Sequence, residues 1–266
     1  MILYSLIAMI NKKYLKLIRC SDRKFRDNFL YDKISERIID SIDLINVPFH
    51  NILEVGVNDQ KILNYLLIKY PNSNYFMADI CKNKLVREKK GKFVKFDIEN
   101  PTFEKNKYDL IYSNFFMNLS DNYKVFFKNI YDSLNTNGFL IATIPNQDNI
   151  FQLVNSMYTT DLQLYNGAYK RFNPTFQIEE ILKIFKEFKF NEPLIRLDKI
   201  QIEYENFSKL INDLRATRLS YCYQDKKKTL ENKRYINYLI ENYKKKYYNG
   251  KYILDIKFNI ISAWKN

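Results

Sequence analysis

The stretch NILEVGVNDQ, residues 51–60, decides the fold class of this chain. Its apolar, β-branched beginning predicts a buried strand, and Gly56 follows the carboxylate of Glu54 where that strand runs into a loop. A strand that ends in an acidic residue and a glycine is typical of the start of a ligand site in nucleotide-binding α/β folds. Asn58 and Gln60 stand where a fully developed loop of this kind has further glycines.

Strand and helix patterns alternate on both sides of this stretch. Apolar runs predict the strands, which are residues 51–57, 74–80, 92–98, 108–116, 139–145, 194–204 and 252–265. Helical periodicity predicts the helices, which are residues 29–42, 61–70, 121–135, 148–160, 176–188, 206–219 and 226–247. Continuous apolar strands that alternate with helices indicate a parallel sheet covered on both faces, which is a doubly wound, Rossmann-like α/β fold.

We expect one domain with terminal additions, because no linker rich in Pro, Gly or Ser divides the chain. Residues 51–205 form the expected core, with an N-terminal capping helix in residues 21–50. Residues 206–250 form a helical insert beside the ligand cleft, and residues 251–266 form the last strand. Residues 1–20 contain four basic side chains and no acid, which predicts a mitochondrial targeting presequence. The alternative for that segment is a helix that packs on the body.

The histidine and cysteine content limits the chemistry of the protein. The one histidine, His50, excludes any site that needs two histidines from one copy of the chain, such as the iron facial triad. The three cysteines, Cys20, Cys81 and Cys222, are far apart in the sequence. We therefore expect reduced thiols with no disulfide partner, and we expect no metal site.

The net charge of +13 is concentrated at the two ends of the chain. Residues 1–30 carry +5 and residues 221–251 carry +6, so the body between them is nearly neutral. Basic surfaces attract acidic proteins, anionic membranes or nucleic acids. We expect a protein partner and consider peripheral contact with an anionic membrane, whereas a nucleic acid is the least favoured of the three.

Three acids stand at corresponding strand ends: Glu54, Asp79 and Asp97. Asp79 lies 23 residues after Gly56, near the separation of about 20 that is typical of a ribose-binding acid. Asp97, at the end of the third strand, is placed to accept from an adenine amino group. Because glycines allow a backbone to approach phosphates, their loss after Gly56 argues against a pyrophosphate. A cationic cofactor without phosphates, S-adenosylmethionine, suits these acids better.

The order of these elements and acids resembles the class I S-adenosylmethionine-dependent methyltransferases. That resemblance implies a mostly parallel seven-stranded sheet with helices on both faces and an antiparallel C-terminal strand. Within this superfamily, YDLIYSNFFMNLSDNYKVFFKNIYDSLNTNGFLIATIPNQDNIFQL (108–153) is similar to the complex I assembly factor 5 family of mitochondrial arginine hydroxylases, which is related to malonyl-carrier-protein methyl ester synthases. FNPTF (172–176), FSKLINDLRATRLSYCY (207–223) and IISAWK (260–265) resemble later landmarks, so the resemblance extends over residues 29–265.

The resemblance implies two sets of site residues and no identified catalytic residue. The positions expected to contact S-adenosylmethionine are Glu54, Gly56, Asn58, Asp79, Ile80, Asp97, Ile98 and Asn114. The positions expected near the substrate are Asn118, Asp148, Asp213 and Arg215. The chain departs from the family at Asn58 and Gln60, and at Asn118 and Leu119, where the family has His-Trp.

The favoured hypothesis is an enzyme of the mitochondrial matrix, with inner-membrane association as an option, that hydroxylates or methylates an arginine of a respiratory-chain subunit. One alternative is a methyltransferase that acts on a small carboxylate or an acyl-carrier substrate, since residues 226–246 are basic enough to receive an acidic carrier. Another is a catalytically inactive assembly scaffold, which the altered glycine loop suggests. An RNA methyltransferase is less favoured, because Ser113-Asn114-Phe115-Phe116 lacks the proline pair of amino-methylating enzymes.

Overall fold

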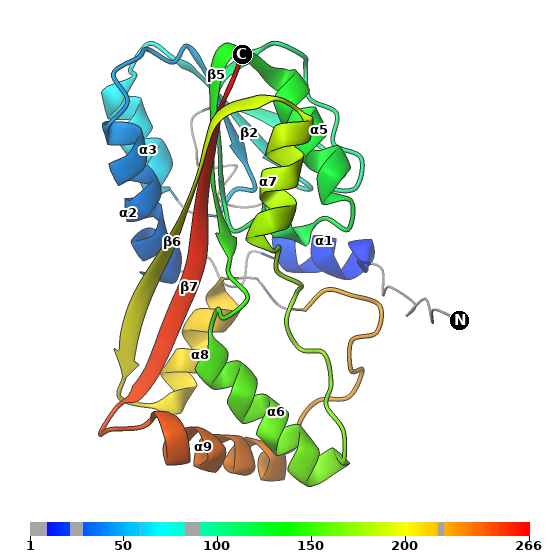
Figure 1. The fold of residues 1–266 in the computed structure, drawn as a ribbon. Helices are drawn as coiled ribbons and strands as arrows, with labels where there is room; N and C mark the ends of the chain where they lie inside the picture. The colour runs from blue at the N-terminus through cyan, green and yellow to red at the C-terminus, as the bar shows by residue number, and fades with distance from the viewer. Residues whose placement is uncertain (1–9, 22–28, 59, 83–90, 218–220) are drawn as a thin grey trace.

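A seven-stranded sheet forms the centre of the protein (Figure 1). A computed structural model describes residues 10–21, 29–58, 60–82, 91–217 and 221–266, and its strands lie in the order β3-β2-β1-β4-β5-β7-β6. The strands are β1 (Asn51–Val55), β2 (Asn74–Asp79), β3 (Lys92–Lys95), β4 (Tyr108–Asn114), β5 (Leu134–Pro145), β6 (Phe190–Tyr204) and β7 (Tyr252–Lys265). Paired strands are parallel except at β7, which runs antiparallel to both β5 and β6. This topology confirms the expected doubly wound, mostly parallel sheet with an antiparallel C-terminal strand.

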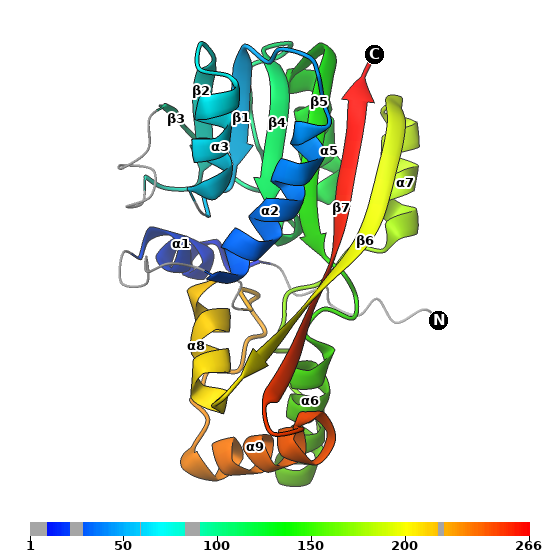
Figure 2. The same ribbon diagram turned by 90° about the vertical axis from the view of Figure 1, so that its left-hand side faces the viewer.

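Helices cover both faces of the sheet, and further helices lie beyond the ends of its parallel strands (Figures 1 and 2). They are α1 (Lys12–Cys20), α2 (Phe29–Asp43), α3 (Lys61–Lys69), α5 (Tyr123–Ser133), α6 (Phe151–Tyr165), α7 (Ile178–Glu187), α8 (Phe207–Ala216) and α9 (Lys233–Tyr247), with a 3-10 turn, η2 (Met117–Leu119). Helices α2 and α3 lie on one face, and α5 and α7 lie on the other. Helices α6, α8 and α9 lie beyond the ends of the parallel strands, beside the far halves of β6 and β7, and α8 and α9 fall in residues 206–250, the expected insert.

Each strand divides its side chains between two cores. In β1, Leu53 and Val55 belong to the core under α5 and α7, whereas Ile52 belongs to the core under α2 and α3. The ring centroids of Phe127 in α5 and Phe185 in α7 lie 5.8 Å apart in the first core. The inner strands are buried on both faces and appear in the sequence as apolar runs, whereas β3 and β6 at the two edges of the sheet are mainly exposed or partly buried.

Asparagine side chains cap the N-termini of four helices. In each case the side-chain oxygen accepts the backbone N–H of the residue three positions later, which satisfies one of the donors that a helix start leaves free. The four pairs are Asn11 with Tyr14 in α1, Asn122 with Val125 in α5, Asn206 with Lys209 in α8, and Asn232 with Tyr235 in α9.

A charged cluster connects α6 with the segment before α9. Arg171 pairs with Asp161 of α6, which is buried, and donates to Glu231 at 2.7 Å. Lys227 donates to the same Glu231 carboxylate at 2.8 Å and lies 3.9 Å from the centre of the Tyr165 ring. Burial acts to raise the pKa of Glu231, but hydrogen bonds from Lys227, Tyr165 and Arg171 outweigh it and lower that pKa.

Several predicted element boundaries differ from the observed ones. The helix predicted for residues 121–135 ends at Ser133, because Leu134 already pairs with Tyr108 of β4. The strand predicted for residues 92–98 ends at Lys95, and beyond it Asp97 forms only an isolated bridge. Tertiary pairing, which sequence periodicity does not report, decides these ends.

The expectation that all three cysteines are reduced was wrong for two of them. Cys20 and Cys81 form a disulfide, with Cα atoms 5.9 Å apart, while Cys222 is free and buried. The two half-cystines are 61 residues apart in sequence, so spacing alone gave no sign that α1 brings Cys20 to the end of β2.

The N-terminal segment packs on the body wherever the structure describes it. Leu15 and Arg19 of α1 are buried, and Ile10 forms a bridge with Tyr223. The targeting presequence in residues 1–20 stays a prediction, and residues 1–9 of it lie outside the described residues.

Candidate functional site

Helix α1 lies across the carboxyl ends of the central parallel strands (Figure 2). In doubly wound folds this edge binds the ligand, beside the first strand. The loop after β1 is joined to the end of β2 here, because the Gly56 N–H donates to the Ala78 carbonyl at 2.8 Å. This edge is therefore the candidate site, and α1 is part of it.

Arg19 of α1 is fully buried at this edge. Its guanidinium pairs with Asp79, and it donates to the Val57 carbonyl at 3.2 Å and to the Asn58 side-chain oxygen. The guanidinium carbon lies 4.9 Å from the centre of the Phe116 ring, which is a cation–π distance. Burial alone would lower the pKa of Arg19, but the charge of Asp79 outweighs it and raises that pKa, so the guanidinium stays charged.

Asp79 ends β2 and is fully buried. Its Oδ2 accepts the Val57 N–H at 3.0 Å, and its Oδ1 accepts the Ile80 N–H at 2.8 Å. The carboxylate therefore holds the loop after β1 against the end of β2 while it pairs with Arg19.

Asn58 occupies the position of a missing loop glycine and makes contacts that a glycine could not make. Its side-chain oxygen accepts from Arg19, and its Nδ2 donates to the Asn114 carbonyl. The residue is 8% exposed. The departure from the glycine pattern at this position thus provides hydrogen bonds to α1 and to the end of β4.

Gly56 allows the ring of Phe116 to pack directly on the loop. Its φ is +81°, and a Cβ added there would lie 2.1 Å from the Phe116 Cγ. The Phe116 side chain is itself fully buried. The close approach that the glycine permits is therefore to a side chain of this chain.

Asp97 lies at the exposed rim of the same edge and pairs with the first turn of α1. The Lys12 ammonium donates to its two carboxylate oxygens at 3.0 and 2.8 Å. Hydrogen bonding from Lys12 lowers the pKa of Asp97. Each end of α1 thus brings one cation to one of the predicted acids.

Three other predicted cofactor positions are buried or partly buried, and only Glu54 of them lies in a strand. Glu54 is 5% exposed in β1, and its charge helps to keep Arg19 protonated. Ile98 belongs to the core under α5 and α7, and Ile80 packs against that core. The two isoleucines are therefore packing residues as well as neighbours of Asp79 and Asp97.

Asn114, at the end of β4, is fixed by its own hydrogen bonds. The Thr143 hydroxyl donates to its Oδ1 at 2.8 Å, and its Nδ2 donates to the Ser35 hydroxyl at 3.0 Å. Its backbone carbonyl accepts from Asn58. Its side chain thus joins β4 to β5 and α2, while its backbone supports the loop.

The four predicted substrate positions lie on different elements. Asn118 is buried in η2, and within the described residues its Oδ1 has no hydrogen-bond partner. Asp148 is exposed after β5, 3.7 Å from the Lys257 ammonium. Asp213 of α8 faces Tyr204, whose pKa is raised by burial and by that carboxylate. Arg215 is exposed on α8. Of the four positions, only Asn118 lies close in sequence to Phe116, which it follows by two residues.

The sequence analysis missed Arg19, Lys12 and Phe116 as members of this site. The four basic residues without an acid in residues 1–20 were a usable signal, since they complement the acids at the strand ends. That signal was assigned to targeting, because nothing in the sequence placed α1 beside the sheet.

The hydrogen-bond acceptors at this edge suit S-adenosylmethionine in chemical type. Asp79 offers a carboxylate for vicinal ribose hydroxyls, Asp97 offers one for an amino group, and Asn118 offers a buried acceptor. Arg19 and Lys12 pair with these two carboxylates in the described structure. This set of acceptors therefore fits the cofactor when these cations move aside.

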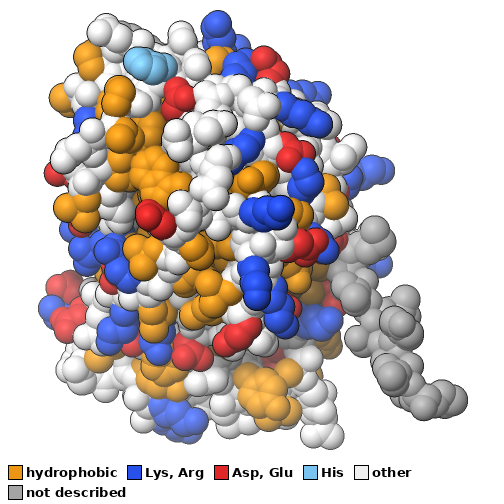
Figure 3. All heavy atoms as spheres, turned by 45° about the horizontal axis from the view of Figure 1, so that its top comes forward, with side chains coloured by type: hydrophobic (Ala, Val, Ile, Leu, Met, Phe, Trp, Pro, Cys, Tyr) orange, Lys and Arg blue, Asp and Glu red, His pale blue; other side chains and the backbone are white. Residues whose placement is uncertain are grey.

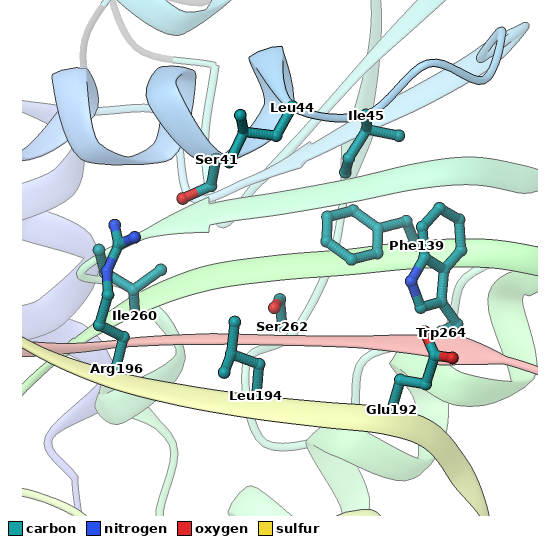
Figure 4. A pocket seen from close by; sticks show the side chains of 10 residues that line it. All are labelled: Ser41, Leu44, Ile45, Phe139, Glu192, Leu194, Arg196, Ile260, Ser262 and Trp264. Carbon is teal, nitrogen blue, oxygen red and sulfur yellow. The ribbon is translucent and has the colours of Figure 1, made fainter.

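A separate cavity of about 360 Å³ lies on another part of the molecule (Figure 4). It is lined by the end of α2 and by β5, β6 and β7, including Leu44, Phe139, Leu194 and Trp264. Apolar side chains gather across the face of the molecule that Figure 3 shows, among charged ones. The lining contains none of the predicted cofactor residues.

Two further properties concern membranes and metals. Of the helices in the described ranges, none combines the length and the apolar character needed to cross a bilayer. In the same ranges, no three side chains of His, Cys, Asp or Glu come together in a way that would hold a metal ion.

Comparison with known proteins gives consistent matches. Residues 19–192, more than half of the chain, match the family model described as "Methyltransferase domain". The mitochondrial arginine hydroxylase NDUFAF5 of Dictyostelium discoideum is 23% identical over 208 residues, which cover 70% of this chain and 48% of that protein. Malonyl-[acyl-carrier protein] O-methyltransferase 2 of Ilyobacter polytropus is 26% identical over 226 residues, 82% of each chain. The chain thus spans about half the length of the Dictyostelium relative.

A solved structure supports the fold. Phosphoethanolamine N-methyltransferase 2 of Haemonchus contortus, crystallised with S-adenosyl-L-methionine, has a TM-score of 0.51 to this chain at 17% identity. The match covers 94% of this chain and 57% of that one.

Proposed function

This chain belongs to the methyltransferase-domain family, a group of S-adenosylmethionine-dependent enzymes, and we propose that it binds this cofactor between Gly56 and Asp79. The observation that supports the proposal most is the position of Asp79. Its carboxylate ends β2, is buried, and binds the Val57 N–H of the loop after β1, which is where a ribose-binding acid is required.

Each residue of the site has a proposed role toward the cofactor. Asp79 would accept hydrogen bonds from the ribose hydroxyls, and Asp97 would accept from the adenine amino group. Glu54 would attract the positive charges of the methionine part. The loop that begins at Gly56 would donate backbone N–H groups to the carboxylate of the cofactor's methionine part. When bound, S-adenosylmethionine supplies an electrophilic methyl group on its sulfonium.

Titration calorimetry with S-adenosylhomocysteine tests the cofactor site. Since Asp79→Asn alone would remove the carboxylate that pairs with the buried Arg19, the substitution is made in the Arg19→Gln background. We expect Asp79→Asn to weaken binding about 10- to 100-fold relative to Arg19→Gln, because charge-assisted hydrogen bonds are worth about 1.5–3 kcal/mol. Asp132→Asn in the same background is the control, since Asp132 pairs with Lys128 on the surface of α5. Equal affinities in all three variants would contradict the assignment of Asp79.

For the substrate, we propose an arginine of a protein, hydroxylated or methylated. Support comes from the arginine hydroxylase relative and from the likeness of residues 108–153 to that family. We propose a respiratory-chain subunit as the protein and the mitochondrial matrix as the location, because the relative is mitochondrial. Recovery of the tagged protein outside mitochondria after cell fractionation would argue against this location.

A second candidate is carboxyl methylation of an acyl-carrier substrate. The malonyl-carrier methyltransferase match favours it, since it covers 82% of both chains. The exposed cations of α9, such as Lys244 and Lys245, would face an acidic carrier.

Mass spectrometry of the products distinguishes the two proposed substrates. The protein is incubated in air with S-adenosylmethionine, with a two-electron reductant for hydroxylation by dioxygen, and with either arginine-containing peptides of respiratory-chain subunits or malonyl-loaded carrier protein. A methyl group or an oxygen on arginine supports the first proposal, and a methyl ester on the malonyl group supports the second. An unchanged mass in both reactions would contradict both substrates while leaving cofactor binding to the calorimetry.

A further inference from the structure

We propose that the last turn of α1 is an autoinhibitory plug, which the Cys20–Cys81 disulfide fixes over the cofactor site. The inference rests on the proposed function, since it takes the Asp79 carboxylate as the ribose-binding group. In the oxidised protein Arg19 holds Asp79 and excludes the cofactor. Reduction of the disulfide frees this turn, and the cofactor then competes with Arg19 for the carboxylate.

The hydrogen bonds of Asp79 show why Arg19 and a ribose exclude each other. A carboxylate offers about four lone-pair sites. The Oδ2 accepts from Val57 N–H at 3.0 Å and from the terminal Nη2 of Arg19, while the Oδ1 accepts from Ile80 N–H at 2.8 Å and from Arg19 Nε at 3.4 Å. The two bonds from Arg19 therefore use the acceptor sites that two vicinal hydroxyls need.

The same helix also covers the second acid of the site. Lys12, in the first turn of α1, donates to both carboxylate oxygens of Asp97. The Arg19 end is the stronger of the two contacts, because the Arg19 pair is buried and the Lys12 pair is half exposed. The turn of α1 that contains Arg19 is accordingly the part that controls access of the cofactor to Asp79.

The disulfide lies where it controls Arg19. Cys20 directly follows Arg19, and Cys81 is the second residue after Asp79, so the covalent bond joins the two segments that carry the ion pair. This linkage keeps the guanidinium at the carboxylate at a high effective concentration, against which a free ligand must compete.

The redox step is a thiol–disulfide exchange with a dithiol reductant. The dithiol gives two electrons and two protons, the sulfur–sulfur bond between Cys20 and Cys81 breaks, and each sulfur becomes a thiol. The dithiol closes to its own disulfide. Noncovalent contacts alone then hold the last turn of α1 against the sheet.

Separate hydrogen bonds hold the start of α1 on the body. Release of the turn that contains Arg19 therefore requires only a local movement. The Ile10 N–H donates to the Asp121 carboxylate at 2.7 Å, and the Asn11 N–H donates to the Cys222 carbonyl at 2.7 Å. These contacts keep the first turn attached while the turn with Arg19 moves away.

The test compares S-adenosylhomocysteine binding to the full chain before and after treatment with dithiothreitol. We expect binding to become at least about tenfold tighter on reduction, because apparent affinity rises with the fraction of molecules whose site is open. Cys20→Ser should bind tightly with or without dithiothreitol, and Cys81→Ser serves as the second such variant. Arg19→Gln should bind tightly even when oxidised, since it keeps the disulfide and loses the guanidinium.

Two variants serve as matched controls. Cys222→Ser removes the free cysteine and should keep the full response to dithiothreitol. Lys16→Ala removes a cation from the exposed face of α1 and should also keep it.

The possible outcomes distinguish failure of the plug proposal from failure of the proposed cofactor site. Equal affinity of the oxidised wild type, the reduced wild type and Arg19→Gln would overturn the plug and leave cofactor binding intact. Absence of binding in every form, including reduced Arg19→Gln, would overturn the cofactor site and the plug together. Tight binding by Arg19→Gln but an unchanged wild type on reduction would overturn the role of the disulfide.

Discussion

Gly56 and Phe116 together set the shape of the loop that follows β1. Phe115 has a φ of 50°, which turns the chain after β4 so that Phe116 reaches back over the loop. The Phe115 N–H donates to the Thr143 carbonyl at 3.1 Å, which holds this left-handed residue in place. Such conformations persist only where the surroundings over-determine them.

We predict that Gly56→Ala lowers the free energy of unfolding by about 2–4 kcal/mol. The new Cβ meets the Phe116 ring, and alanine at a φ of +81° adds strain. Urea unfolding followed by circular dichroism measures the change. Gly167→Ala is the control, because its added Cβ has no atom within 4 Å outside the two neighbouring residues of the chain. A loss of the same size in both variants would show that contact with Phe116 is not the cause.

The acidic residues of the site were predictable from the sequence, because they stand at or near the ends of predicted strands. The order of strands placed Glu54, Asp79 and Asp97 at one edge of the sheet, and the structure agrees. The partners of these acids were not predictable, since Arg19 lies 60 residues before Asp79 in the chain. The spatial neighbour of a strand end depends on how a separate helix packs, which local patterns do not encode.

Helix starts in this protein depend on asparagine side chains. Asn11, Asn122, Asn206 and Asn232 each accept a backbone N–H from the first turn of their helix. In α9 this cap comes directly after the charged cluster around Glu231, so it fixes where the helix begins relative to that cluster.

We predict that Asn232→Ala costs about 1 kcal/mol of stability, while Asn232→Asp stays within a few tenths of wild type. Alanine leaves the Tyr235 N–H without its acceptor, whereas aspartate supplies an equivalent oxygen. Thermal and urea unfolding measure both. If aspartate costs as much as alanine, the hydrogen bond of the cap does not explain the loss.

Element types were largely predictable from the sequence, and their ends were not. All seven predicted strands exist: the inner strands are buried on both faces and leave apolar runs, while the edge strand β6 is mainly exposed and has mixed apolar and polar residues. The beginning of β5 was misjudged: Asn137 and Gly138 resemble a helix end, yet they lie within the strand, which has an irregular register near its start. Asn137 has a φ of 61°. This left-handed conformation occurs both at helix ends and at irregularities within strands.

The whole molecule consists of a sheet with its flanking helices and a group of helices beyond the strand ends, joined by the long β6 and β7 (Figures 1 and 2). The cluster of Arg171, Asp161, Glu231 and Lys227 stabilises that outer group. Because the folded-state pKa of Glu231 is lowered, its carboxylate adds stability above the unfolded-state pKa of about 4.3.

We predict that this contribution is lost as the pH falls through the lowered pKa of Glu231. Glu231→Gln should therefore reduce stability at neutral pH and flatten the decline of stability in acid. Urea midpoints measured across the acidic range give the slope. The control is Glu203→Gln, which removes an exposed carboxylate 3.6 Å from Lys251 and should keep the wild-type slope. An unchanged slope in Glu231→Gln would contradict the prediction.

The charge of the whole molecule gives a further prediction. If α9 is the basic surface that meets an anionic membrane, Lys244→Glu with Lys245→Glu should weaken cosedimentation with phosphatidylserine vesicles more than about tenfold. Lys183→Glu with Lys186→Glu makes the same change of charge on α7 and should have a smaller effect. Equal losses would mean that net charge, and not the α9 surface, drives binding.

The Cys20–Cys81 bond has a practical consequence for anyone who prepares this protein. Two batches that differ only in whether a thiol was kept in the buffer would be two molecular species, separable by their mobility on a non-reducing gel. Activity assays on such batches would disagree for reasons unrelated to purity or concentration. The thiol state of each preparation should accordingly be recorded beside every binding constant.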